Sequence, residues 1–249
     1  MNSPANYIYG RHALEEALAS GPQTIKKVYF SRAMDDRDLR NAVMRAGITI
    51  AELKEHGKGT HVDSNVSHQG VVAQVDLERL MLPYKEFISS LSTSPTTALI
   101  LLDELTDPHN VGAIIRSAGA FGIAGVLIPP HRQAPVTAAV VKVSAGMAFK
   151  VPLVAITNIN STIDDLKKRG FWIYGLAGEG SKPLAGETFS APSVLVLGNE
   201  AHGIREKTRE HCDVLLSIPM HPRCESLNVA ASTAIALYAW SQGHADALA

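Results

Sequence analysis

Residues 98–116 read ALILLDELTDPHNVGAIIR, and this stretch decides the fold class. Its first five residues are all apolar, and continuous apolar character is typical of a strand buried on both faces, as in a parallel sheet. A polar cluster and a helical pattern follow, from Asn110 to Arg116. Two further clusters, Gly198-Asn199-Glu200 and Ser226-Leu227-Asn228, also follow apolar runs. Open α/β sheets bind ligands at the carboxyl ends of their strands, so these clusters predict an enzyme site.

Helix and strand patterns alternate along the rest of the chain. Within residues 1–76 the pattern predicts a helix over 35–46, and Gly47 ends this helix as a left-handed cap. Residues 77–97 contain prolines and a Ser/Thr run, which favours a linker. The other predicted helices cover 11–20 and 227–242, and the predicted strands cover 25–30, 48–53, 70–75, 98–103, 125–128, 151–156, 171–175, 194–197 and 214–218. We therefore predict a small α/β domain over 1–76 and a larger one, with a mostly parallel sheet, over 98–249.

The composition narrows the class of protein. A hydrophobic content of 46% argues against wholesale disorder. No apolar run approaches the roughly 20 residues that span a bilayer, and no leader-like pattern opens the sequence, so we expect a soluble cytoplasmic protein without a membrane partner. The two cysteines, Cys212 and Cys224, lack the spacing of a metal site, and we expect no metal. Since the net charge is −1, any RNA-binding face must be a local arrangement.

Each polar residue of the three clusters has a structural alternative to a functional role. Arg116 is either a surface residue or a fixed cation for a phosphate or a developing oxyanion. Asn110 alone is most often a helix cap, Glu200 a solvated loop residue or cap, and Ser226 and Asn228 caps of the last helix. Neither GxGxxG nor GxxxxGK[ST] occurs, which disfavours a dinucleotide site or a P-loop. Only the joint occurrence of the three clusters favours a functional role.

In their order, the clusters resemble the three signature motifs of the SpoU (TrmH) family of S-adenosylmethionine-dependent RNA ribose 2′-O-methyltransferases. Residues 107–118, 195–204 and 218–230 carry this resemblance. Residues 9–14 and 68–73 resemble the N-terminal domain of the subgroup that methylates a guanosine in 23S rRNA. That domain resembles kink-turn-binding ribosomal proteins. The resemblance covers nearly the whole chain.

The resemblance implies a SPOUT fold with a deep trefoil knot that holds the methyl donor, and a homodimer that joins through the knotted domain. The implied partner is RNA, and 23S rRNA is the expected target. The implied donor-binding residues are Leu197, Gly198, Ile218, Met220 and Leu227, the catalytic ones are Asn110, Arg116, Glu200, Ser226 and Asn228, and the RNA-binding ones are Tyr9, Arg11, His12 and His68. The four RNA-binding candidates could alternatively serve only the packing of their domain.

Methyl transfer to a ribose hydroxyl depends mainly on positioning. We favour Arg116 as an electrostatic clamp, since a guanidinium does not lose its proton in proteins; Glu200 could alternatively orient Arg116. Pro222 stands where the family often has glycine, and this could change the rim of the donor pocket. A nucleophilic role for Cys224 is disfavoured, because the reaction needs no covalent enzyme intermediate.

Three other functions compete with methylation of a guanosine in 23S rRNA. The target could be transfer RNA or another ribosomal nucleotide, because the motifs define the chemistry better than the substrate. A non-catalytic protein of ribosome assembly would be free to lose Arg116, Glu200 and Asn228, which are all present. An unrelated nucleotide-binding metabolic enzyme is disfavoured by the missing phosphate-binding loops.

Overall fold

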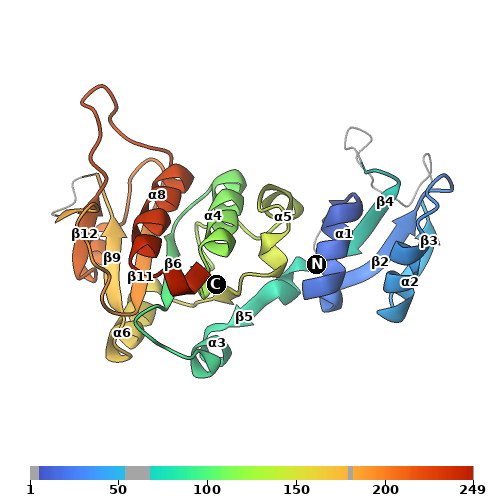
Figure 1. Ribbon diagram of the computed structural model, residues 1–249, viewed down its shortest axis with the longest axis horizontal. Coiled ribbons are helices and arrows are strands. Elements are labelled where there is room, and N and C mark those ends of the chain that lie inside the picture. Colours follow the sequence, from blue (N-terminus) through green and yellow to red (C-terminus); the bar gives the residue numbers. More distant parts are fainter. Residues whose placement is uncertain (1–5, 54–67, 179–181, 249) are drawn as a thin grey trace. The chain divides into compact units, whose positions relative to one another are not determined.

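The computed structural model describes residues 6–53, 68–178 and 182–248 (Figure 1). The chain divides into two units. Unit 1 comprises Met1–Leu80 and Val136–Lys150, and unit 2 comprises Met81–Pro135 and Val151–Ala249. Each unit has its own sheet.

Unit 1 is built on a four-stranded sheet in the order β1-β4-β2-β3. Strand β4 runs antiparallel to both its neighbours, whereas β2 and β3 are parallel. The helices α1 and α2 contact each other as well as the strands, which places both on one face of the sheet. The elements are β1 (Asn6–Tyr9), α1 (Arg11–Ser20), η1 (Pro22–Thr24), β2 (Ile25–Phe30), α2 (Arg37–Arg45), β3 (Thr49–Glu52), β4 (Val71–Val75), η2 (Leu77–Leu80), α5 (Ala138–Val143) and η3 (Met147–Phe149).

Helix α2 shows how local sequence sets an element of unit 1. The side chain of Asp36 caps it, accepting a hydrogen bond from the Leu39 amide at 3.0 Å. Leu39 and Val43 are the buried residues of this helix. Gly47 follows with a φ of 70°, which is the predicted left-handed cap.

Unit 2 contains an eight-stranded sheet in the order β10-β12-β9-β11-β6-β7-β8-β5. Every neighbouring pair is parallel, which confirms the predicted mostly parallel sheet. The strands are β5 (Met81–Pro83), β6 (Ala98–Asp103), β7 (Gly125–Ile128), β8 (Leu153–Ala155), β9 (Trp172–Leu176), β10 (Lys182–Pro183), β11 (Ser193–Gly198) and β12 (Val214–Ser217). The central strands β6 and β11 are buried along their whole length.

Helices cover both faces of this sheet. On one face, Leu99 and Val196 form a buried cluster with Phe87 of α3 and Ile163 of α6. Helices α4 and α8 lie side by side (Figure 1), and α8 also contacts β11. The helices of the unit are α3 (Tyr84–Ser90), α4 (Pro108–Ala120), α6 (Ile159–Lys168), α7 (Glu206–Glu210), α8 (Val229–Gln242) and the 3-10 turn η4 (Ala245–Leu248). The result is the layered α/β architecture that places ligand sites at strand ends.

The predicted linker, 77–97, contains more regular structure than its sequence pattern indicated. It holds η2, β5 and α3, and β5 pairs with β8 at the edge of the large sheet. Phe87 and Ile88 of α3 are buried. The three residues of β5 are too few to show a period, so their strand pairing depends on β8. The domain boundaries and the trefoil knot stay predictions.

Candidate active site

A cavity of about 410 Å³ lies in unit 2 at the carboxyl ends of β9, β11 and β12. Leu176 of β9 and Leu216 of β12 contribute apolar walls. The loop after β11 and the segment that leads into α8 provide the remaining lining. Eight of the predicted site residues line this one cavity, and they are Leu197, Gly198, Glu200, Ile218, Met220, Ser226, Leu227 and Asn228. The second and third sequence clusters therefore meet, although almost 30 residues separate them.

Asn110 connects the first cluster to the other two. Its Nδ2 donates a hydrogen bond to Oε1 of Glu200 at 3.0 Å, and its Oδ1 accepts one from Nδ2 of Asn228 at 2.9 Å. Asn110 is buried, with 8% of its surface exposed. Both ends of its side-chain amide are thus engaged, which fixes the orientations of Glu200 and Asn228 at the edge of the cavity.

The helix-cap interpretation is wrong for Asn110 and correct for Asn228. Helix α4 is capped by Asp107, whose carboxylate accepts a hydrogen bond from the His109 amide at 2.8 Å. Asn228 caps α8, because its Oδ1 accepts hydrogen bonds from the amides of Ala230 and Ala231. Since Asn228 uses its oxygen for the cap and its nitrogen for Asn110, the capping role and the site role coexist in one side chain.

The loop after β11 folds closely over Gly198. A Cβ atom at this position would lie 2.1 Å from the amide nitrogen of Ile204. Asn199 and Gly203 exchange backbone hydrogen bonds at 2.9 and 2.8 Å, and the Asn199 Oδ1 accepts from the Ala201 amide at 2.9 Å. The tight turn brings backbone to the cavity edge, and only glycine leaves room for it.

A buried carboxylate fixes the end of this loop. Asp103, at the end of β6, is fully buried and accepts hydrogen bonds from the backbone amide of Arg205 at 3.0 Å and from its Nε at 2.6 Å. Glu104 adds an ion pair to Arg205 at 3.1 Å, and its backbone carbonyl accepts a hydrogen bond from Asn199 at 2.8 Å. Glu104 has a φ of 63°, an uncommon conformation that these contacts hold in place. The ends of β6 and β11 are therefore linked beside the cavity.

Sequence reasoning missed the pair Asp103–Arg205 and the cavity walls Leu176 and Leu216. The signal for the walls was present, since Leu216 lies in the predicted strand 214–218 and Leu176 directly follows the predicted strand 171–175. No pattern indicated the ion pair, because 102 residues separate its members.

Arg116, a predicted catalytic residue, does not line the cavity. It lies on α4 six residues after Asn110, about 240° further round the helix. The side chain is exposed and does not line the cavity. Within the described residues it forms no hydrogen bond or ion pair, and Glu200 is bonded to Asn110 instead. The alternative in which Glu200 orients Arg116 stays a prediction.

The loop that carries Pro222 lies outside the lining of the cavity. Pro222 is exposed, and its neighbours form a turn in which the Cys224 amide donates to the His221 carbonyl at 2.9 Å. Glu225, directly after this turn, does line the cavity.

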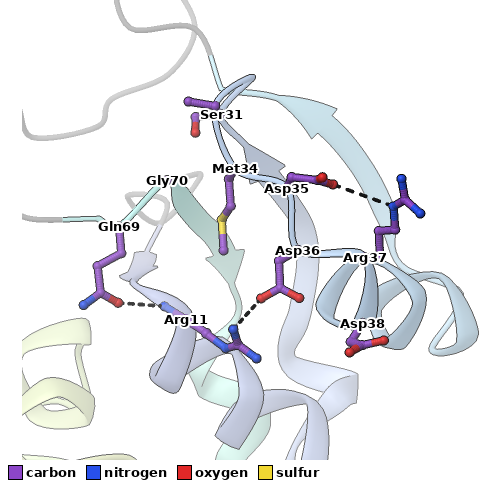
Figure 2. Close-up of a pocket in the computed structure, with 10 residues that line it drawn as sticks. Arg11, Ser31, Met34, Asp35, Asp36, Arg37, Asp38, Gln69 and Gly70 are labelled. Carbon is purple, nitrogen blue, oxygen red and sulfur yellow. Dashed lines mark hydrogen bonds and ion pairs between the residues drawn. The ribbon is translucent and has the colours of Figure 1, made fainter.

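The four candidate RNA-binding residues all lie in unit 1. Figure 2 shows Arg11 pointing towards Asp36, with which it forms an ion pair at 2.7 Å, and Arg11 also bonds Glu15 at 2.7 Å. Arg11 and Asp36 border an open hollow of about 740 Å³ that Asp35 and Asp38 also line. Arg11 is therefore held by carboxylates on its own unit.

Tyr9, His12 and His68 occupy different positions in unit 1. Tyr9 and His12 line a mainly apolar pocket of about 350 Å³ together with Tyr7. His68 stabilises a turn, since its Nδ1 accepts a hydrogen bond from the Gly70 amide at 3.1 Å. RNA contact by all four residues stays a prediction.

Two family models match this chain over the regions just described. The SpoU rRNA Methylase family matches residues 97–238, which include the cavity and all three clusters. The chain belongs to this family. A second model, for RNA 2′-O ribose methyltransferase substrate binding, matches residues 7–81 of this SpoU-family chain.

Curated relatives agree with the family models. A protein of Yersinia pestis named 23S rRNA (guanosine-2′-O-)-methyltransferase RlmB is 38% identical over 234 residues, covering 93% of this chain and 94% of the relative. The protein of the same name from Coxiella burnetii is 40% identical, with 93% of each chain covered.

Solved structures show the same fold. A putative RNA methyltransferase of the TrmH family from Porphyromonas gingivalis aligns with a TM-score of 0.71 at 27% identity, covering 95% of this SpoU-family chain and 89% of the other. The SpoU methyltransferase AviRb from Streptomyces viridochromogenes, crystallised with AdoMet, aligns with a TM-score of 0.76 at 24% identity, covering 96% and 89%.

Two other features concern metal ions and membranes. In ranges 6–53, 68–178 and 182–248, no group of three or more His, Cys, Asp or Glu side chains is placed to hold a metal ion. No helix in that part of the chain is long and apolar enough to cross a membrane.

Proposed function

We propose that this SpoU-family protein transfers a methyl group from S-adenosylmethionine to the ribose 2′-hydroxyl of a guanosine in 23S rRNA. The observation that carries the proposal is the contact of Asn110 with both Glu200 and Asn228 beside one cavity. These hydrogen bonds join the three family motifs into a single site. The names of the curated relatives support ribosomal RNA as the substrate, with transfer RNA as the alternative.

The cavity suits the methyl donor in size and chemistry. Its volume of about 410 Å³ lies within the usual range of small-molecule sites, about 300–1,000 Å³. Leu197, Ile218 and Met220 offer apolar surface for a flat ring system, while Gly198 brings backbone close. Ser226, Asn228 and Ser232 supply polar groups. When bound, S-adenosylmethionine supplies a methyl group on a sulfonium, and the sulfur keeps the bonding electron pair as the methyl leaves.

The residues around the cavity have to position the ribose and favour loss of its proton. Glu200 and Asn228 are held by Asn110, so their orientation is set before the substrate binds. Arg116 supplies a fixed positive charge for a substrate phosphate and for the developing alkoxide.

A homodimer would bring Arg116 to a cavity. Helix α8 exposes Ile235 (40%) and Tyr238 (58%) on one side, and α8 packs against α4, which carries Arg116. Exposed apolar residues in a row mark an interaction surface. We therefore propose that two copies join through α4 and α8, and that Arg116 of each subunit serves the cavity of the other. The proposed compartment is the cytoplasm.

Transfer of labelled methyl groups to 23S rRNA, followed by mapping of ribose methylations, tests the function. We expect one modified guanosine in RNA from cells that contain the protein and none where it is deleted. Binding of S-adenosylmethionine without transfer to ribosomal or transfer RNA would favour the non-catalytic alternative. Absence of donor binding would exclude the methyltransferase.

Mixed dimers test the role of Arg116. Arg116→Ala should abolish transfer while leaving donor affinity nearly intact, and Gly198→Ala should abolish donor binding. If Arg116 acts on the partner's cavity, mixing the two inactive variants restores about a quarter of the activity, because half of the dimers are mixed and each has one intact site. No recovery in mixed dimers would show that each site is complete within one subunit.

A further inference from the structure

The side chains that line the cavity give it a negative charge. Two carboxylates line it, Glu200 and Glu225, and no Lys, Arg or His does so within the described residues. A cavity with negative side chains and no cation favours a positively charged ligand.

The two carboxylates differ in their hydrogen bonds to the rest of the chain. Glu200 accepts the hydrogen bond from Asn110 at 3.0 Å and is part of the second family motif. Glu225 lies in the segment between β12 and α8, next to Ser226 and Leu227, which also line the cavity. Its side chain is exposed and forms no hydrogen bond or ion pair with another described residue. Glu225 is therefore the carboxylate that is available to a ligand.

The ligands before and after methyl transfer differ by one charge. S-adenosylmethionine has a sulfonium, an ammonium and a carboxylate, with a net charge of +1. Methyl transfer forms a C–O bond and breaks the C–S bond, the sulfur retains the electron pair, and the proton of the ribose hydroxyl is released to solvent. The product, S-adenosylhomocysteine, is a neutral thioether with no net charge. A negative side chain at the cavity thus attracts the donor more than the product.

We infer that Glu225 is a specificity-determining residue that favours the charged donor over its neutral product. This inference rests on the proposed function. After each turnover, the Glu225 carboxylate would favour replacement of the bound product by a new donor molecule. Solvent screens the charge at this position, so the effect on affinity is moderate, roughly two- to five-fold.

Calorimetric titration of the full-length protein tests the inference, with S-adenosylmethionine and S-adenosylhomocysteine as separate ligands. Glu225→Gln removes the charge and preserves the shape. We expect the dissociation constant of the donor to rise roughly two- to five-fold and that of the product to stay nearly unchanged. Added salt should reduce the preference of the wild type for the donor and have less effect on the variant.

Two controls make the result decisive. Glu210→Gln removes an exposed carboxylate of α7 that does not line the cavity, and it should leave both affinities unchanged. Sinefungin, in which a carbon that bears an amine replaces the methylated sulfur, should follow the donor because the amine is positively charged. Equal changes for donor and product, or no change, would overturn the inference. A wild type that binds neither ligand would instead overturn the proposed function.

Discussion

The Nδ2 atom of Asn228 donates a hydrogen bond to Oδ1 of Asn110 at 2.9 Å, across 118 residues of sequence. Asn110 in turn donates a hydrogen bond to Glu200, which lies 90 residues from it in the sequence. Each asparagine uses a donor and an acceptor, so neither a carboxylate nor an aliphatic side chain can replace it without leaving a partner unsatisfied. The site therefore depends on amide chemistry at both positions.

Asn110→Asp should disrupt this arrangement. The new carboxylate loses the donor to Glu200 and places two acceptors face to face. We expect the rate of methyl transfer to fall at least about tenfold and stability to fall by about 1–3 kcal/mol, the cost of unsatisfied buried groups. Initial rates and urea unfolding measure the two effects. Asn41→Asp, the same change at an exposed position of α2, is the control. An unchanged rate would contradict a positioning role of Asn110.

Gly198→Ala should close the donor cavity. The added Cβ would lie 2.1 Å from a backbone nitrogen of the Ile204 amide, and backbone cannot yield as a flexible side chain does. Displacement of the loop should abolish donor binding, because the added atom would overlap backbone that cannot move aside. Gly178→Ala is a matched control in the same cavity, because a Cβ there meets nothing within 4 Å. Calorimetry that finds equal donor affinity in both variants would refute the steric argument.

The sequence predicted those features that depend on local patterns. The strands Ile25–Phe30, Ala98–Asp103 and Gly125–Ile128 have the predicted bounds, because each run is rich in Ile, Val, Leu or aromatic residues and ends at a clear break. The sequence also predicted that the second and third clusters lie in one site, because both follow strands and both resemble family motifs.

Features that depend on distant partners could not be predicted in this way. β5 and β10 have three and two residues, and neighbouring strands determine their pairing. Asn110 looked like a cap in isolation, since nothing local showed that Asp107 already fills that role. The ion pair of Asp103 with Arg205 needs the folded sheet to bring its members together.

Arg205→Ala should affect both stability and donor binding. Asp103 would keep its bond to the backbone amide and lose the guanidinium, at a cost of about 1–3 kcal/mol. The loop from Asn199 to Ile204 would lose an anchor, so donor affinity should fall as well. Arg205→Lys should recover part of the affinity by restoring the charge. Lys207→Ala, at an exposed position nearby, should change neither property. Lower stability with full donor affinity would limit Arg205 to a structural role.

The two cysteines should react at very different rates. Burial raises the pKa of Cys212 to about 12, so little thiolate exists near neutral pH. Cys224 is exposed. We expect a thiol reagent such as DTNB to label Cys224 first and Cys212 only after unfolding. Cys224→Ser should remove the fast phase and preserve methyl transfer, and loss of transfer in that variant would support a direct role for the thiol.

Acid should weaken the contact between α3 and α6. The Arg169 guanidinium and the Tyr84 hydroxyl donate to the Asp165 carboxylate at 2.8 and 2.7 Å, and the bond from Arg169, followed by that from Tyr84, lowers the pKa of Asp165. A pKa that is lower in the folded than in the unfolded chain contributes stability above the unfolded value, and this contribution is lost as pH falls through the folded value.

Asp165→Asn tests this contribution. The variant should unfold more easily than the wild type near neutral pH, by less than about 1 kcal/mol because the side chain is partly exposed, and the difference should vanish in acid. Urea unfolding at several values between about pH 3 and pH 7 measures it. Tyr84→Phe is the control for the hydroxyl: it removes one donor and keeps Arg169, so an intermediate loss is expected. A difference between wild type and Asp165→Asn that is constant with pH would show that packing, and not the charge of Asp165, joins the two helices.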